Sequence, residues 1–271
     1  MKRPLIQILL LLGVLAACKD NPVIPNETQT VIQAYLYAGS EVNQVYVYES
    51  AAIGSTDSMN IPVPNASVSI YMNGTQFKLQ PDAQMAGKYT YQGTGMSITP
   101  GKTYQLIVEA NGRTSTAECT VPNPPVGVLS SQSTMTYKEE SISTPFGTRT
   151  FWTSDDSLRI EWANPGNDYH YVLVESVDPN RTLIQSDTLR RFRFVTQPTQ
   201  DSYYRMGAFS VNYTGRYRAL VYRVNKEYVD LYRSREQDSR SLNEPLTNIK
   251  NGLGIFTAFA ADSVFFEVKV E

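Results

Sequence analysis

The chain has 271 residues, with 26 acidic and 24 basic side chains, one histidine and two cysteines. This balance argues against a nucleic-acid-binding protein, because such a protein needs a basic face to contact phosphates. Hydrophobic residues make up 41% of the chain and there are 18 tyrosines. The chain can therefore bury substantial cores, and its aromatic content favours β-structure.

The first 17 residues have the layout of a secretory signal. A short basic start precedes the apolar run Leu5–Ala17, which is too short to span a bilayer as a stable helix. The run leads into the sequence Leu-Ala-Ala-Cys at 15–18, which resembles a bacterial lipobox. We therefore predict that residues 1–17 are a lipoprotein signal peptide and that Cys18 carries acyl chains, such as palmitate, that anchor the protein to a membrane.

Residues 18–29 are polar and contain two prolines, which predicts an extended tether between the lipid and the folded chain. Lys19 follows the cysteine, at the position where an aspartate would favour retention in the inner membrane of many Gram-negative bacteria. The pair Lys19-Asp20 also resembles the start of the signal that sends Bacteroidota lipoproteins to the outer face. The sequence thus predicts an outer-membrane location, surface-exposed or on the periplasmic leaflet.

Residues 30–121 read as successive short strands. Ile32, Ala34 and Leu36 alternate with polar or tyrosine positions, as on a half-buried strand. The dipeptides at 73–74 and 111–112 are Asn-Gly, which predicts tight hairpin turns. About seven strands at this spacing predict an immunoglobulin-like or transthyretin-like β-sandwich, with 50–65 as a surface loop.

Residues 122–126 hold a proline cluster, which cannot continue a central strand and predicts a stiff linker. Residues 127–271 again alternate as strands, with Trp162 on one of them. This pattern predicts a second β-rich domain of fibronectin type III-like kind. One short helix interrupts it, with Asn225 as the expected N-cap and apolar residues at helical spacing after it.

Five features run through nearly the whole chain: the lipobox, Val63–Val68, Pro100–Leu106, the strand ending at 121–122, and Asn248–Phe256. Together they resemble a family of Bacteroidota outer-membrane lipoproteins known only as a domain of unknown function. The resemblance implies an N-terminal sandwich, a second β-rich region and frequent association with TonB-dependent outer-membrane transporters. It supplies no catalytic residues.

The residue types that carry catalysis or metal binding are scarce. His170 is the only histidine, and a structural role for it is favoured over a catalytic one. Cys119 falls on the less polar face of a predicted strand, so we expect a small buried hydrophobe and not a reactive thiol. Zinc sites usually need several histidines or cysteines, so no metal or other cofactor is expected, and the chain is predicted not to be an enzyme.

Two further segments allow a functional and a structural interpretation. Arg190–Phe194 alternates basic and aromatic residues, which fits an anion site or, as we favour, a solvated strand face. Gly252 and Gly254 fit a phosphate-binding loop only if a helix and a lysine follow. The sequence continues as strand, so a tight turn is favoured there.

Four short segments resemble the Asp-Ser/Thr-apolar sites of O-glycosylation in Bacteroidota. We expect one or two of them to be modified, with the first as the most accessible; the acceptor residues are Ser58, Ser157, Thr188 and Ser263.

The sequence therefore predicts a non-enzymatic outer-membrane lipoprotein, an accessory binding component of a TonB-dependent nutrient uptake system with a ligand still to be named. The alternative is a structural or adhesive cell-surface module in which the sandwiches act as spacers. A hydrolase with dispersed carboxylates is a third hypothesis.

Overall fold

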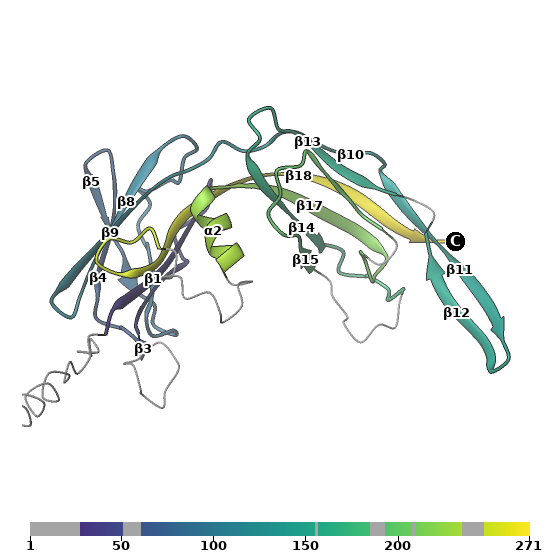
Figure 1. Cartoon of the computed structure of the whole chain (residues 1–271), viewed down its shortest axis with the longest axis horizontal. Helices are drawn as coiled ribbons and strands as arrows, with labels where there is room; N and C mark the ends of the chain where they lie inside the picture. Colours follow the sequence, from purple (N-terminus) through teal and green to yellow (C-terminus); the bar gives the residue numbers. More distant parts are fainter. Residues whose placement is uncertain (1–27, 51–60, 155–156, 185–192, 208–209, 235–246) are drawn as a thin grey trace, which may run out of the picture.

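The computed structural model describes residues 28–50, 61–154, 157–184, 193–207, 210–234 and 247–271. It confirms the predicted fold class: the chain is mainly β, forms two sandwiches, and has one helix in the described ranges, α2 (Lys226–Ser234) (Figure 1). A single sheet of eleven strands runs through both sandwiches. Each half of this long sheet is covered by a smaller sheet of its own.

The long sheet has an unusual strand order, because its two central strands come from opposite ends of the sequence. Across the sheet the order is β15 (Arg193–Val195), β14 (Tyr169–Ser176), β17 (Gly215–Val224), β18 (Leu253–Val270), β1 (Thr30–Tyr37), β2 (Val45–Glu49), β7 (Lys88–Thr90) and β6 (Gln80–Pro81). Three strands pair off this path: β3 (Ile61–Pro62) with β2, β11 (Thr134–Thr144) with β18, and β12 (Gly147–Thr153) with β11.

The two smaller sheets are antiparallel, and along the chain their strands are interrupted by strands of the long sheet. The first sandwich is closed by β5 (Thr75–Lys78), β4 (Ser67–Met72), β8 (Thr103–Ala110) and β9 (Arg113–Thr120). The second is closed by β10 (Val126–Ser130), β13 (Arg159–Ala163) and β16 (Tyr203–Arg205).

The predicted hairpin turns are confirmed. Asn73 and Gly74 join β4 to β5 with φ of 50° and 80°, and Asn111 and Gly112 join β8 to β9 with 51° and 74°. Positive φ at both central positions is the type I′ geometry, which matches the right-handed twist of the flanking strands. Asparagine and glycine adopt it at lower cost than other residues.

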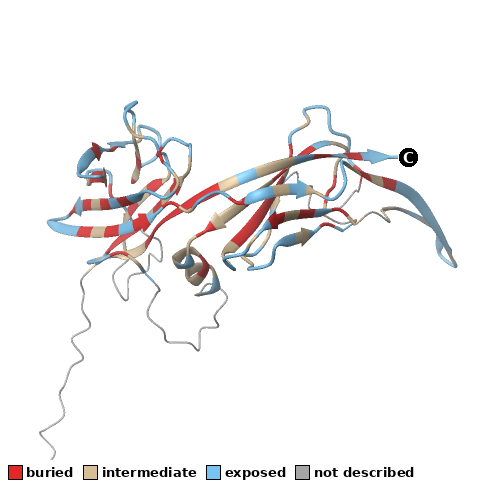
Figure 2. Cartoon of the chain, turned by 90° about the horizontal axis from the view of Figure 1, so that it is seen from above, coloured by how far each residue is buried: buried red, intermediate tan, exposed pale blue. Residues whose placement is uncertain are grey.

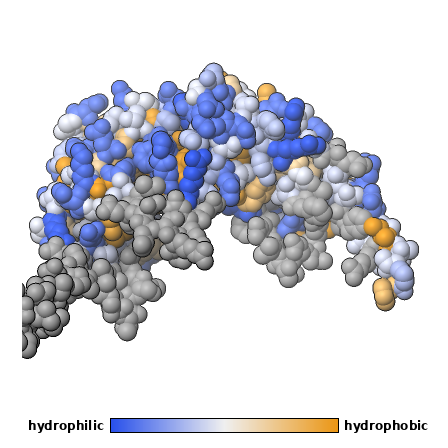
Figure 3. All heavy atoms as spheres, viewed as in Figure 1, coloured by the Kyte–Doolittle hydropathy of each residue, from blue (hydrophilic) through white to orange (hydrophobic). Residues whose placement is uncertain are grey.

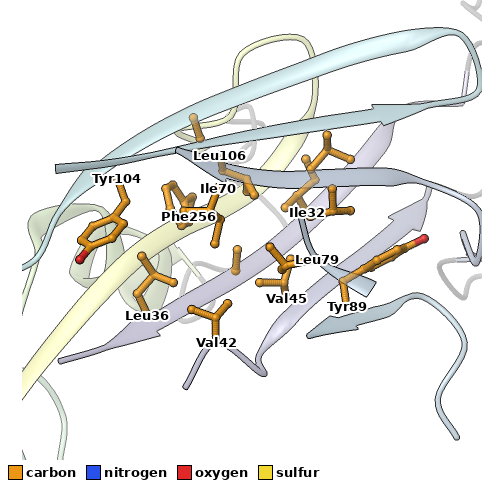
Figure 4. Packing of buried hydrophobic residues seen from close by; sticks show 14 of the residues in the cluster. Ile32, Leu36, Val42, Val45, Ile70, Leu79, Tyr89, Tyr104, Leu106 and Phe256 are labelled. Atoms are coloured by element: carbon orange, nitrogen blue, oxygen red, sulfur yellow. The ribbon is translucent and has the colours of Figure 1, made fainter. Parts of the chain in front are cut away.

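The first core lies between β1, β2 and the start of β18 on one side and β4 and β8 on the other (Figure 4). Buried Tyr89 contributes a polar anchor: its hydroxyl donates to the Val63 carbonyl at 2.7 Å and accepts from the Ala66 amide at 2.8 Å.

The prediction of a surface loop over residues 50–65 is wrong at the end of that segment. Residues 61–62 pair with β2, and Val63 is buried in the core.

Strand β18 belongs to both sandwiches. Its first part, Leu253–Phe259, pairs in parallel with β1, and its second part pairs antiparallel with β17. Successive side chains of a strand point to opposite faces. Phe256 therefore enters the first core and Phe266 the second core from the same face of one strand. The chain beyond the 122–126 linker, predicted to be a separate second domain, thus also completes the first sandwich.

Gly254 makes this crossing sterically feasible. A Cβ atom on Gly254 would lie 1.9 Å from the carbonyl oxygen of Ile32, and its φ is +107°. Just before it, Asn251 has φ 58°, and its carbonyl accepts the Ser115 hydroxyl at 2.8 Å. A turn is present at 251–252, as predicted, but Asn251 and not a glycine has the positive φ in it, and Gly254 already lies within β18.

Asn248 secures the same crossing through its side chain. The amide nitrogen donates to the Phe256 carbonyl at 2.7 Å, and the amide oxygen accepts the Phe256 N–H at 2.9 Å. The side-chain amide of Asn248 thus pairs with both backbone groups of Phe256, as a neighbouring strand would. This pairing holds the buried phenylalanine in register.

The second core gathers around the predicted strand with Trp162, which is confirmed as β13. Met135 and Tyr137 at the start of β11 are also buried there. Beyond Tyr137, β11 and β12 leave the body as a two-stranded hairpin with mostly exposed residues (Figure 2). Phe146 at its turn is fully exposed, and hydrophobic colour marks the hairpin's end in Figure 3. This hairpin was not predicted from the sequence.

Candidate functional site

The face of the long sheet that points away from both cores carries a third, aromatic cluster. Phe259 of β18 lies on this face because it is odd-numbered, whereas the even-numbered residues enter the two cores. Helix α2 lies against the face from the concave side of the arch (Figure 1). The buried members of this cluster are Tyr171, Leu173, Val224, Val229 and Phe259.

Helix α2 begins where the sequence predicts, but Asn225 acts differently from the predicted N-cap. Its backbone carbonyl accepts the Tyr228 and Val229 amides at 3.2 and 3.5 Å. Its side-chain amide instead donates to the Thr120 carbonyl of β9 at 3.0 Å. Asn225 therefore fixes the start of the helix to the first sandwich.

The aromatic rings of this face pack closely. Tyr171 stacks on its cross-strand partner Tyr222, with centroids 4.8 Å apart and planes at 16°. Tyr37 stacks on Phe259 at 5.0 Å and 19°, and Tyr228 of α2 meets Phe259 edge-on at 5.0 Å. Offset stacked and edge-to-face pairs are the favoured arrangements of aromatic rings. The packing keeps these rings in fixed orientations.

A cleft opens beside this packing. Its outer part has a volume of about 400 Å³ and its inner part, under α2, about 190 Å³. The two parts share four lining residues, namely Tyr37, Gln44, Tyr171 and Tyr228. This size lies in the range of about 300–1,000 Å³ that is usual for small-molecule sites.

Both sandwiches contribute to the cleft. The connection between β1 and β2 supplies Ser40, Glu41 and Asn43 to one wall of the outer part. The second region supplies the opposite wall through β14, β15 and β17, including Arg193. The inner part is mainly aromatic and aliphatic. A ligand in this cleft would contact both sandwiches at once.

The cleft tyrosines stay protonated at neutral pH. Burial, and after it the neighbouring tyrosines, raise the pKa of Tyr37 to about 12. Burial likewise raises the pKa of Tyr171 and of Tyr222, while the positive charge of Arg193 opposes the rise in all three. Their hydroxyls are therefore neutral groups that can each donate one hydrogen bond.

The predicted modification sites do not gather at this cleft. Cys18, Ser58 and Thr188 lie outside the described residues. The half-buried Ser157 accepts a hydrogen bond from Arg205 Nε, and Ser263 lies within β18 opposite Leu220. O-glycosylation stays a prediction, and an intact-mass measurement without added hexose would argue against it.

Cys119 and His170 are structural, as predicted. Cys119 is buried in the first core, and burial raises the pKa of its thiol. His170 is 2% exposed, lies against the Trp162 ring at 5.5 Å, and its Nδ1 is 3.1 Å from the Asp168 carbonyl. Burial lowers the pKa of His170, so the neutral form is favoured.

The described ranges contain neither a cluster of metal ligands nor a membrane-spanning helix. No three histidine, cysteine or carboxylate side chains gather there in a way that could hold a metal ion. Within the same ranges no helix combines the length and hydropathy needed to cross a membrane.

The cleft could not be predicted from the sequence, although some of its residues follow a visible pattern. Tyr35 and Tyr37 occupy the positions of β1 that alternate with its core residues, and tyrosine on such a face is ambiguous. Tyr171 and Tyr222 lie about fifty residues apart in the sequence, and only the pairing of β14 with β17 places them together.

The fold and the cleft define a two-sandwich β-protein with an aromatic site at the junction. The chain belongs to a family described as "Domain of unknown function (DUF4249)", which matches residues 20–264. The predicted family membership is thereby confirmed. No curated protein matches the chain.

Solved structures that resemble the chain are tandem β-domains, at low TM-scores. The FN1–FN3 domains of chicken CNTN1 have 12% identity and a TM-score of 0.30, covering 90% of this chain and 68% of that one. Domains A168–A170 of titin have 10% identity and 0.20, with 89% and 66% covered. The IG1+IG2 structure of DIP-gamma has 12% identity and 0.19, with 90% and 97% covered.

Proposed function

We propose that this protein is a non-enzymatic, lipid-anchored outer-membrane protein that captures a ligand for a TonB-dependent transporter. The observation that carries the proposal is the aromatic cleft, whose walls come from both sandwiches. A largely pre-formed cleft with aromatic walls and a few polar groups is the usual form of a small-molecule site. The lipobox at Cys18 supports the anchor, and the family resemblance supports the transporter.

The anchor is tested by Cys18→Ser. Without the thiol the chain cannot be acylated, so the variant should appear in the soluble fraction with an unchanged fold. Circular dichroism of the released protein checks the fold. If Cys18→Ser stays membrane-bound, the proposed anchor is wrong.

The partner is tested by affinity purification of the tagged, full-length protein from the native membrane in mild detergent. A TonB-dependent transporter should copurify, and mass spectrometry would identify it. A tagged lipoprotein of similar abundance serves as the control. Recovery of no transporter, or of the same transporter with the control, would overturn this part of the proposal.

The role of the cleft is tested by Ser40→Trp, which places a large ring at the exposed wall of its outer part. Ser143→Trp, on the exposed hairpin, is the matched control. Growth limited by the transporter's substrate should slow with Ser40→Trp alone, while both variants still copurify with the transporter. Equal growth of the two variants would show that the cleft does not serve uptake.

A structural or adhesive role is the second candidate, supported by strand β18, which runs without a break through both sandwiches. Such a joint suits a stiff spacer. A deletion strain with normal uptake and altered attachment would favour this role over ligand capture.

A further inference from the structure

The outer part of the cleft brings together several hydrogen-bond donors that have no partner among the described residues. The hydroxyls of Tyr37, Tyr171 and Tyr222 make no hydrogen bond with any residue in the described ranges. Their rings are neighbours: Tyr222 lies 4.8 Å from Tyr171 and 6.2 Å from Tyr37, between ring centroids. Neutral phenols in this position offer O–H groups to a ligand.

Arg193 lines the outer part of the cleft together with these three tyrosines. It is exposed on β15, and it makes no ion pair within the part of the chain that the structure describes. Its neighbour across the strand pair, Glu175, is already bound to Arg218 of β17. The guanidinium thus keeps its charge and its donors available for a ligand.

Three phenols and one guanidinium form a set that is rich in donors and carries positive charge. Such a set matches a carboxylate, which accepts several hydrogen bonds and pairs with a guanidinium in two-point geometry. Glu41 lies on the opposite wall, beside Asn43 and Gln44. That wall would repel a second anionic group and would accept hydrogen bonds from hydroxyl or ammonium groups.

The inner part of the cleft sets the shape of the rest of the ligand. Tyr35, Tyr232 and Phe259 line it together with Leu231, under the helix. Aromatic walls favour a ring or another flat, partly apolar body, because such a body buries its faces against them.

We propose that the cleft binds a small organic acid whose carboxylate meets Arg193 and the three tyrosine hydroxyls, and whose ring lies in the aromatic inner part. The inference rests on the proposed function and names the ligand class of the same site. Two sources share this chemistry: an acidic sugar and an aromatic acid.

The test is isothermal titration calorimetry of the purified chain with pairs of probes, each an acid and its neutral analogue. Galacturonate is compared with galactose, and phenylacetate with phenylacetamide. An acid of at least one pair should bind about tenfold more tightly than its neutral analogue, because hydrogen bonds to a charged group are the stronger ones. The pair that binds identifies the source. If neither acid exceeds its analogue, the proposal is wrong.

Two variants locate the binding. Arg193→Gln should lower the affinity for the acid about tenfold and leave the affinity for the neutral analogue unchanged. Tyr222→Phe should lower the affinity for the acid less, since the ring is retained. Arg159→Gln, on β13 in the other sheet, is the matched control and should have no effect. Equal binding of the acid to Arg193→Gln and the wild type would overturn the site.

The outcome is separable from that of the proposed function. Copurification with a transporter and slow growth of Ser40→Trp, without selective binding of acids, would leave the function standing and reject the ligand class. Selective binding of an acid without copurification of a transporter would support the ligand class and reject the proposed function.

Discussion

The two sandwiches share strand β18 but differ in how it pairs in each of them. In the second sandwich, the end of β18 pairs antiparallel with β17, which is the strand that precedes it in the sequence. The first sandwich takes the start of β18 from residues more than two hundred positions away, in parallel pairing with β1. A parallel partner requires a long connection, and here the connection includes the other strands of the first sandwich and those of the second up to β17.

This difference teaches that the first sandwich is incomplete without the C-terminal part of the chain. Its core contains Ile249, Phe256 and Ala258 in addition to its own residues. The same strand positions the aromatic face between the sandwiches, so stability and the candidate site depend on one element. The experiments below test that dependence.

The largest effect is expected from Gly254→Val. The new side chain would collide with the Ile32 carbonyl and force a branched residue to a positive φ. We expect a loss of more than about 3 kcal/mol in the free energy of unfolding, measured with urea. Gly112→Ala, at a positive φ with no atom within 4 Å, is the control and should cost roughly 1–2 kcal/mol. A Gly254→Val variant as stable as this control would disprove the close crossing.

Phe256→Ala should come next, with a loss of about 3–5 kcal/mol for a buried phenylalanine. Two probes separate the sandwiches in a Cys18→Ser background. Labelling of the Cys119 thiol reports the first core, and the fluorescence of Trp162, with Trp152 replaced by phenylalanine, reports the second core. Because β18 is shared, both midpoints should fall together.

Phe266→Ala, in the second core, is the reciprocal variant and should also move both probes. If Phe256→Ala moves only the thiol signal, the sandwiches unfold independently, and β18 does not couple them.

Asn248→Ala should cost less, about 1–3 kcal/mol, because the backbone N–H and C=O of Phe256 both lose their partner. Asn248→Asp keeps the acceptor and loses only the donor. It should therefore fall between the wild type and the alanine variant in urea midpoint. Three equal midpoints would mean that Asn248 does not hold the crossing.

The smallest effect is a pH dependence that belongs to the second sandwich. Burial lowers the pKa of His170 below its ordinary value, so the unfolded chain takes up this proton more readily. Stability should fall as the pH drops from 7 towards 5, by about 1.4 kcal/mol for each unit of pKa difference. His170→Gln should have a flatter profile over this range, and parallel profiles would contradict the prediction.

Much of the fold follows from local sequence patterns. The Asn-Gly turns at 73–74 and 111–112 and the alternation in β1, β13 and β17 predict their elements, since turn chemistry and a period of two are local properties. The β11–β12 hairpin was not predicted. Most of β11 beyond Tyr137 is exposed, so its sequence lacks the alternation of buried and exposed residues that indicates a strand.

The candidate site could not be predicted in the same way. Arg193 was interpreted as part of a solvated strand face, and β15 indeed leaves it exposed. Its place in the cleft depends on Tyr37 from the first sandwich and on Tyr222 from β17. Residues that meet through long-range pairing leave no pattern of spacing along the chain.

The sequence by itself determined the class of elements, the turns, the family and the buried roles of Cys119 and His170. These follow from side-chain periodicity, glycine and asparagine conformations and residue chemistry. Only the tertiary structure decided that β18 closes both sandwiches and that an aromatic cleft opens at their junction. The physical reason is that a β-strand can pair with a strand from anywhere in the chain. The backbone groups that form these hydrogen bonds are the same in every strand, so the sequence of a strand does not identify its partner.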